Sequence, residues 1–302
     1  MKKINVGIAG GAGYTGGELL RILVHHPEVH ISFVHSSSNA GKPVSAVHTD
    51  LVGDTDLLFT SSFSENIDLL FLCVGHHESK KILAEQPISA SVCIIDLSQD
   101  FRLTPNATIG DRTFVYGLPE LNREKITTAK NIANPGCFAT AIQLALLPLA
   151  KAGLLQDIYT TGITGSSGAG QSLSATSHFS WRANNIQAYK TLDHQHVFEI
   201  VQSLNQLQSD APLSTSGEGS GLHFVPWRGD FTRGIYTSSV MDCSLPLEVI
   251  QEMYANYYAA HPFVVVSETP IHLKQVVNTN KCVLQIEKQG NKLVLHSAID
   301  NL

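Results

Sequence analysis

The glycine-rich segment at residues 10–17 constrains the fold more than any other feature of this chain. An apolar run of strand length precedes it, and an amphipathic helical pattern follows it. Glycines spaced three apart let the turn pass close to a pyrophosphate, whose charge then lies at the helix N-terminus. A turn that only packs a helix on a sheet would not need so many glycines. We therefore predict a dinucleotide site that involves Gly10, Gly13, Tyr14, Thr15 and Gly16.

Short apolar runs alternate with helical patterns through the first half of the chain. After the run at residues 4–9 and the helix at 17–25, further strand-like runs occupy residues 29–35, 69–74 and 92–97. Alternating strands and helices form a parallel sheet with right-handed crossovers. The pattern predicts an α/β, Rossmann-type domain over residues 1–135.

The second half has a different pattern, with longer β-rich stretches around helices at residues 196–206 and 247–261. This pattern indicates an α+β domain on an antiparallel or mixed sheet, over residues 136–290. The Ser/Gly-rich segments 164–172 and 214–221 are expected to be loops. Strands are expected at residues 158–163, 234–244, 262–266, 282–287 and 292–297.

Composition narrows the range of partners and compartments. The net charge of -6 and the lack of a basic stripe argue against nucleic acid, so a small molecule is the expected partner. The five cysteines are scattered and form no metal-binding spacing, which favours a reduced, cytoplasmic setting and no metal site. No apolar run is long enough to cross a bilayer, and residues 1–3 lead into a strand rather than a signal peptide. We expect no membrane partner.

The end of the second strand indicates which dinucleotide would bind. NAD-binding proteins usually present a carboxylate there for the ribose hydroxyls, whereas residues 34–42 contain none. The hydroxyls of Ser36 and Ser37 and the ammonium group of Lys42 suit a 2′-phosphate instead. We therefore predict NADP as the cofactor; the alternative is an ordinary polar loop.

Cys137 is the candidate nucleophile. It follows a Pro-Gly turn and stands at the head of an apolar, helix-like run at residues 139–149. The N–H groups and positive dipole end of a helix favour thiolate over thiol. The alternative is a small buried hydrophobic residue at a helix start.

His194 and His196 are the candidate acid/base groups beside a cysteine. They are two residues apart, so on a regular element one would point toward the sulfur and the other elsewhere. Glu199 lies three residues after His196, within reach on one helical turn, and could orient that imidazole. We favour His196; His194 could equally be a surface or substrate-contacting residue.

Several motifs occur together in this chain and in one order. With these motifs, the chain resembles the N-acyl-gamma-glutamyl-phosphate reductases of arginine biosynthesis, which are relatives of aspartate-semialdehyde dehydrogenase. The motifs are Gly-Gly-Ala-Gly-Tyr-Thr-Gly at 10–16, Ile-Asp-Leu-Ser-Gln-Asp-Phe-Arg at 95–102, Tyr-Gly-Leu-Pro-Glu at 116–120, Asn-Pro-Gly-Cys at 134–137, Gly-Ser-Ser-Gly-Ala-Gly at 165–170, His-Gln-His-Val-Phe-Glu-Ile at 194–200, Arg-Gly-Ile at 233–235 and Ala-Ile-Asp-Asn-Leu at 298–302.

The resemblance implies an NADP domain followed by a catalytic and dimerisation domain. Cys137 would attack the acyl phosphate and hold the substrate as a thioester, which NADPH would reduce to the semialdehyde. Arg102 and Arg233 would bind the phosphate and carboxylate groups of the substrate, and Ser167 and Gly168 would lie over the cofactor. The runner-up activity is that of aspartate-semialdehyde dehydrogenase, and a nucleotide-binding protein without turnover is the non-enzyme alternative.

An apolar sheet face left open in the second domain predicts a homodimer or homotetramer.

The chain departs from the family pattern at three places. Ser37 stands where arginine is common, which leaves Lys42 to carry the 2′-phosphate. Trp227 and Arg228 replace a histidine and an apolar residue, so we expect an apolar wall and a cation for the substrate, suited to an acyl group that ends in a carboxylate, such as succinyl. The alternative is an exposed Arg228 that pairs with Asp230. Residues 291–302 are expected to begin a shortened return to the first domain.

We predict that Lys42→Glu raises the Michaelis constant for NADPH much more than that for NADH. A carboxylate at this position would repel the 2′-phosphate that only NADPH carries. Steady-state kinetics with both cofactors measure the effect. Equal efficiency of the wild-type protein with NADPH and NADH would contradict the assignment.

Overall fold

The computed structural model describes residues 3–215 and 220–302. Two short segments lie outside this range. They are residues 1 and 2, which were expected to lead into a strand, and residues 216–219, which belong to the predicted loop 214–221. The chain divides into two compact units, residues 1–135 and 136–302, called unit 1 and unit 2 below. Within the described residues, no helix is long and apolar enough to span a bilayer.

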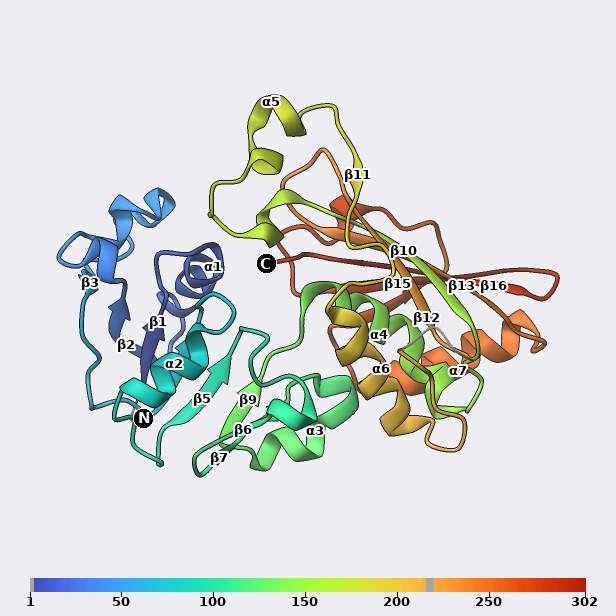
Figure 1. Ribbon diagram of the computed structural model, residues 1–302, viewed down its shortest axis with the longest axis horizontal. Helices are drawn as coiled ribbons and strands as arrows, with labels where there is room; N and C mark the ends of the chain where they lie inside the picture. Colours follow the sequence, from blue (N-terminus) through green and yellow to red (C-terminus); the bar gives the residue numbers. More distant parts are fainter. Residues whose placement is uncertain (1–2, 216–219) are drawn as a thin grey trace. The chain divides into compact units, whose positions relative to one another are not determined.

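Unit 1 is built on a seven-stranded sheet in which every adjacent pair is parallel (Figure 1). The prediction of an α/β, Rossmann-type domain with a parallel sheet is therefore confirmed. In sheet order, the strands are β3 (Phe59–Thr60), β2 (Val29–His35), β1 (Ile4–Ala9), β4 (Leu69–Leu72), β5 (Cys93–Asp96), β9 (Asn131–Ala133) and β8 (Val115–Tyr116). The helices are α1 (Tyr14–Leu23), α2 (Glu78–Glu85) and α3 (Pro119–Thr128), and a small hairpin pairs β6 (Thr108–Ile109) with β7 (Arg112–Thr113).

Burial on both faces of the sheet explains the continuous apolar runs of unit 1. On one face, Val6 and Ile8 of β1 are fully buried in a cluster with Leu20 of α1, and on the other face Ala9 of β1 is fully buried in a second cluster. Strands covered by helices on both sides need apolar residues at successive positions, which is why these runs were visible in the sequence. β9 is short and was not predicted.

Unit 2 holds a second seven-stranded sheet, and it is mixed, as predicted. The pairs β10·β12 and β14·β15 are parallel, and the other pairs are antiparallel. In sheet order, the strands are β11 (Gln187–Ala188), β12 (Leu222–Arg228), β10 (Ile158–Thr164), β13 (Ile235–Asp242), β16 (Lys292–Ile299), β15 (Cys282–Gln289) and β14 (Val264–Ser267). The helices are α4 (Cys137–Lys151), α5 (Phe179–Arg182), α6 (His196–Leu207) and α7 (Leu247–Tyr258).

Two of these strands bear on the sequence predictions. Residues 291–302 were expected to begin a return to the first domain. They contain β16, which lies in the sheet of unit 2 between β13 and β15. β12 was not predicted, because Pro226 interrupts its apolar pattern.

Helix α4 forms the buried centre of unit 2. All of its residues from Phe138 to Ala150 except Thr140 are buried, so it reads as an apolar run rather than an amphipathic helix. Pro148 lies inside it and has no N–H to donate to the carbonyl of Leu144. The hydroxyl of Tyr258, from α7, donates to that carbonyl instead. The proline is thus compensated by a second helix.

We predict that Tyr258→Phe lowers the free energy of unfolding by about 1–3 kcal/mol, because the buried Leu144 carbonyl loses its donor. Tyr257→Phe, a change of the same kind at the neighbouring, less buried residue, should cost less. Urea unfolding of both variants measures the difference. Equal effects would show that the Tyr258 hydroxyl is not needed at this carbonyl.

Candidate functional site

The glycine loop of unit 1 leaves no room for side chains. A Cβ on Gly10 would lie 2.4 Å from the Cys73 carbonyl oxygen, and one on Gly16 would lie 2.7 Å from the Cα of Gly11. Gly10 also has a φ of 77°, which disfavours other residues. Gly13 caps the N-terminus of α1, whose first turn carries no acidic side chain. This open backbone cradle at a helix N-terminus fits a dinucleotide pyrophosphate.

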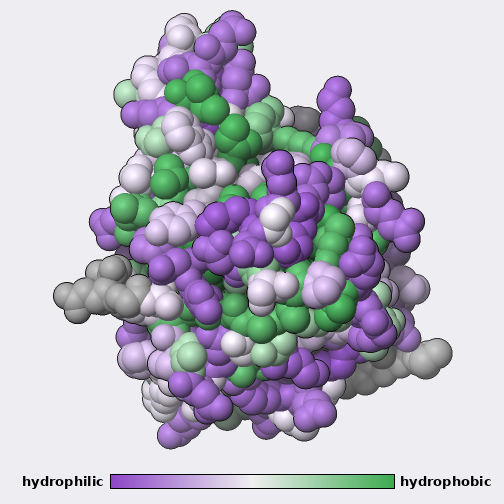
Figure 2. Space-filling model, turned by 90° about the vertical axis from the view of Figure 1, so that its right-hand side faces the viewer, coloured by the Kyte–Doolittle hydropathy of each residue, from purple (hydrophilic) through white to green (hydrophobic). Residues whose placement is uncertain are grey.

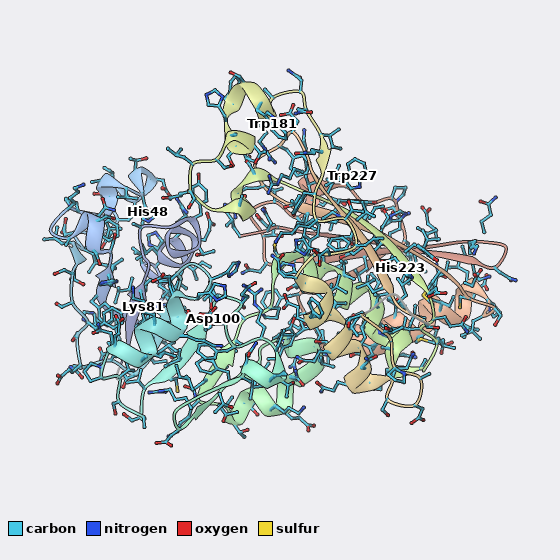
Figure 3. All side chains as sticks on the ribbon, viewed as in Figure 1. His48, Lys81, Asp100, Trp181, His223 and Trp227 are labelled. Carbon is cyan, nitrogen blue, oxygen red and sulfur yellow. The ribbon has the colours of Figure 1, made fainter. Side chains whose placement is uncertain are left out.

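Sequence reasoning missed one residue of this loop. His48, which no motif singles out, is buried, and its Nε2 donates to the Gly11 carbonyl oxygen at 2.7 Å. This bond holds the loop from outside the glycine motif. No spacing in the sequence connects residues 11 and 48, so only the structure reveals the contact. His48 is labelled in Figure 3.

The residues after β2 present hydroxyl, amide and ammonium groups. Ser36 is buried, Ser37 Oγ lies 3.4 Å from His35 Nε2, and Lys42 Nζ donates to Asn39 Oδ1 at 3.3 Å. Ser37 and Lys42 are exposed. An exposed lysine held only by a neutral amide is available to a phosphate.

Arg102 is largely occupied by backbone groups of unit 1. Its Nε donates to the Asn134 carbonyl at 2.8 Å, and its Nη2 donates to the Leu97 carbonyl at 3.0 Å. The side chain therefore ties the loop after β5 to the end of β9. Nearby in sequence, Asp100 accepts hydrogen bonds from the backbone N–H groups of His77 and Lys80 at the start of α2 (Figure 3).

In unit 2, Cys137 is the first residue of α4, as the sequence predicted. Its side chain is partly exposed, and Gly136 provides the helix N-cap. No acidic residue lies in the first turn of α4. The helix dipole therefore favours the thiolate without opposition from a carboxylate of that turn.

Glu199 connects the start of α4 to the start of α6. Its Oε2 accepts the backbone N–H of Gly136 at 3.2 Å, and its Oε1 lies 3.6 Å from His196 Nε2. Both side chains are buried. One carboxylate thus holds the backbone beside Cys137 and the imidazole that follows.

His194 lies in the same cluster. Its ring packs on that of His196 with centroids 4.6 Å apart, and its Nδ1 accepts the His196 backbone N–H at 3.2 Å. The two rings thus lie together rather than on opposite faces, because His194 precedes the helix and its ring turns back onto the helix start. The alternative of a surface histidine is wrong, since only 4% of His194 is exposed.

The electrostatic state of His194 differs from that of an ordinary histidine. Burial, and then the neighbouring His196, lower the pKa of His194 to about 3. His194 is therefore neutral at physiological pH. It can pass a hydrogen bond but contributes no charge.

Tyr189 is a second residue that the sequence did not reveal. Its ring meets that of His194 edge-on at 5.7 Å, and burial, followed by the charge of Cys137, raises the pKa of Tyr189 to about 12. The phenol is thus a protonated donor near the sulfur. Tyr189 follows β11 in a segment without a motif, so nothing in the sequence pointed to it.

The 165–170 loop is pinned rather than flexible. Ser167 Oγ donates to the Thr232 carbonyl at 2.6 Å, and Asn301 Oδ1 accepts the Gly234 N–H at 2.6 Å. A Cβ on Gly168 would lie 3.0 Å from Asn301 Nδ2. The loop is therefore held by the residues around the start of β13 and the end of β16.

Arg233 and Arg228 have different surroundings. Arg233 pairs with the buried Asp300, with Nη2 3.0 Å from Oδ2. Arg228 is half-buried, and its Nη1 donates to Thr176 Oγ1 at 2.8 Å, whereas the alternative was an exposed Arg228 paired with Asp230. Trp227, labelled in Figure 3, precedes Arg228 on β12, and because successive strand residues alternate, the two side chains lie on opposite faces of the strand.

The described residues contain no cluster of His, Cys, Asp or Glu that could hold a metal ion.

Family comparisons match both units. Residues 5–129 match the family described as semialdehyde dehydrogenase, NAD binding domain, and residues 137–301 match semialdehyde dehydrogenase, dimerisation domain. Among solved structures, the aspartate-semialdehyde dehydrogenase II of Vibrio cholerae, complexed with ASA, superposes with a TM-score of 0.73 at 17% identity, covering 100% of this chain and 94% of that one. The Candida albicans enzyme, solved with NADP, gives 0.70 at 15% identity, covering 98% and 93%.

These matches define the chain's class as a semialdehyde dehydrogenase with a nucleotide-binding and a dimerisation domain. Relatives from Christiangramia forsetii, Flavobacterium johnsoniae and Bacteroides thetaiotaomicron are each 52% identical to it, over 99% of this chain and 90% of theirs. All three are named N-acetyl-gamma-glutamyl-phosphate reductase. The chain belongs to the N-acetyl-gamma-glutamyl-phosphate reductase family.

We predict that His194 makes the protein less stable in acid. The unfolded chain binds a proton at His194 below its ordinary pKa of 6.5, whereas the folded chain does so only near 3. The contribution is therefore fully present above about pH 6.5 and is lost as the pH falls toward about 3, by at most about 1.4 kcal/mol per pH unit. His194→Gln should lose less stability between about pH 7 and pH 5 than the wild type. Urea unfolding at both values measures this, and identical losses would contradict it.

Proposed function

We propose that this protein catalyses the NADPH-dependent reductive dephosphorylation of an N-acyl-gamma-glutamyl phosphate, N-acetyl or another acyl, to the N-acyl-glutamate 5-semialdehyde in arginine biosynthesis. The observation that carries the proposal is the position of Cys137 at the head of α4, with Glu199 joining that helix start to His196. Relatives with 52% identity bear the name of this activity. The arrangement provides a nucleophile, a proton carrier and a group that orients the carrier.

The chain's own residues account for the first half of the reaction. The Cys137 thiolate forms a bond to the acyl carbon, the bond from that carbon to the phosphate oxygen breaks, and phosphate leaves with the electron pair. Backbone N–H groups at the start of α4 face the developing oxyanion. His196 holds the thiol proton, and Glu199 stabilises the imidazolium. His194 and Tyr189 stay neutral and help to exclude water from the site.

Unit 1 supplies the cofactor site for the second half. Gly10, Gly13 and Gly16, with Tyr14 and Thr15, would hold the pyrophosphate, and Ser36, Ser37 and Lys42 would hold the 2′-phosphate. In unit 2, Ser167 and Gly168 would contact the nicotinamide side. Bound NADPH supplies the hydride that reduces the thioester to the semialdehyde. The carbon–sulfur bond then breaks to release the aldehyde, and His196 returns its proton to the Cys137 sulfur.

A homodimer or homotetramer is part of the proposal. One face of the unit 2 sheet is covered by α4 and α6, and the other carries residues such as Tyr159, which is 59% exposed and stacks on His223 with ring centroids 4.7 Å apart. Figure 2 shows apolar and polar residues side by side on the face that it draws. A second copy would bury such aromatic pairs. The five unbridged cysteines suit the cytoplasm, where we place the protein.

Two alternatives remain testable. An aspartate-semialdehyde dehydrogenase would prefer aspartate semialdehyde, and a nucleotide-binding protein without turnover would accept neither aldehyde. Turnover is measured with NADP⁺, phosphate and either an N-acyl-glutamate 5-semialdehyde or aspartate semialdehyde. The preferred aldehyde, or the absence of turnover with both, distinguishes the proposed function from its two alternatives.

We predict that Cys137→Ser abolishes turnover but leaves nucleotide binding intact, because a serine hydroxyl is a far poorer nucleophile than a thiolate at neutral pH. A labelled acyl group should be trapped on the wild type and not on the variant. Cys93→Ser, which alters a partly exposed cysteine of unit 1, should retain turnover and is the control. More than about a hundredth of wild-type activity in Cys137→Ser would rule out the covalent mechanism.

A further inference from the structure

Two arginines of unit 2 lie together beside Tyr189. The Cζ of Arg228 lies 4.5 Å from the centroid of the Tyr189 ring, and its Nη1 donates to the Thr176 hydroxyl. Arg182, at the end of α5, donates from Nη2 to the Gly229 carbonyl at 2.7 Å. Both side chains are half-buried. Their hydrogen-bond partners are neutral.

The charges around these arginines do not balance. Burial, followed by the positive charge of Arg228, lowers the pKa of Arg182, and Asp230 opposes this shift. Asp230 also accepts the Asn184 backbone N–H at 2.6 Å. Two guanidinium groups and one carboxylate leave one positive charge in a half-buried place. Holding like charges out of water costs free energy, and a bound anion would offset that cost.

Tyr189 connects the arginines to the reacting sulfur. Its phenol feels the charge of Cys137 as well as those of both arginines. Its ring also meets the ring of His194, which packs on His196. The positive charge therefore lies at one side of the candidate active site.

The register of β12 independently places Arg228 on the side of the strand that meets the start of α4. Arg228 shares a strand face with Phe224, and the Phe224 ring packs on that of Phe138 with centroids 5.1 Å apart. Phe138 is the residue directly after Cys137 in α4. The face of β12 that carries Arg228 is thus the face that meets the start of α4.

We propose that Arg228 and Arg182, with Tyr189 beneath them, bind a carboxylate of the substrate at the end remote from the acyl phosphate. This inference rests on the proposed function. The planar fork of arginine matches a carboxylate in two hydrogen bonds, and stacking on the ring holds Arg228 in one orientation. Two sources exist for the carboxylate: the α-carboxylate of the glutamyl group, and the terminal carboxylate of a dicarboxylic acyl group.

The test uses the whole protein in the reverse direction, with NADP⁺, phosphate and either N-acetyl- or N-succinyl-glutamate 5-semialdehyde. Arg228→Gln should lower kcat/KM about tenfold or more, mainly through KM, because a charge-assisted hydrogen bond is lost. Asp230→Asn keeps the side-chain oxygen that accepts from Asn184 but removes a negative charge, so KM should fall. Lys292→Gln removes an exposed cation that pairs with Asp242 elsewhere in unit 2, and should change neither constant.

The two aldehydes distinguish the sources. An equal loss with both substrates in Arg228→Gln identifies the α-carboxylate, whereas a loss confined to the succinyl compound identifies the acyl carboxylate. Less than about a twofold change in KM with both substrates would overturn the proposal. So would a rise in KM in Asp230→Asn, since opposite effects of the two charge changes are what separate binding from a structural role.

Direct binding keeps this test apart from the test of the proposed function. If the wild type turned over neither aldehyde, the proposed function would fail. Calorimetry with the unreactive acids N-acetylglutamate and N-succinylglutamate would still measure the carboxylate subsite in the same variants. Unchanged affinity in Arg228→Gln would overturn the subsite on its own.

Discussion

The close approach of two helix starts at Gly136 is the constraint on which the candidate active site of unit 2 depends. A Cβ at this position would lie 2.5 Å from His196 Nε2 and 2.6 Å from Glu199 Oε1. A side chain at position 136 would therefore displace the His196 and Glu199 side chains, whereas glycine lets its backbone N–H bond the Glu199 carboxylate. Because the carboxylate is bonded to this backbone, it is fixed for its second task at His196. The contacts of Glu199 that join α4 to α6 are therefore also the contacts that position the proposed catalytic groups.

Two buried side chains beside the proposed nucleophile and its partners, His194 and Tyr189, are neutral at physiological pH. The pKa of His194 is lowered to about 3 and that of Tyr189 is raised to about 12, in each case chiefly by burial. Both shifts favour the uncharged form. A carboxylate, an imidazole and a thiolate in such surroundings interact more strongly than they would in water. The charges that remain are those with a proposed chemical or binding task.

The parts of the structure predicted correctly from the sequence are those fixed by local pattern. β1 and β2 begin and end where the sequence predicted, because their buried positions, such as Val6, Ile8, Ile31 and Phe33, carry apolar residues. The glycine loop and the helix at Cys137 were visible since each combines a turn with an apolar run. The i, i+3 spacing likewise put Glu199 within reach of His196.

What the sequence did not reveal arises from contacts between distant segments. His48 reaches Gly11 from a segment without regular strands, and Tyr189 reaches His194 from the stretch after β11. β12 was missed because Pro226 breaks its apolar pattern. The proline is tolerated in this strand because β12 has only the two-residue strand β11 as its neighbour on one side. With β12 absent from the prediction, the alternation that separates Trp227 from Arg228 could not be seen. Strand register, rather than residue type, decides which of two adjacent side chains lies on the face of β12 that meets the start of α4.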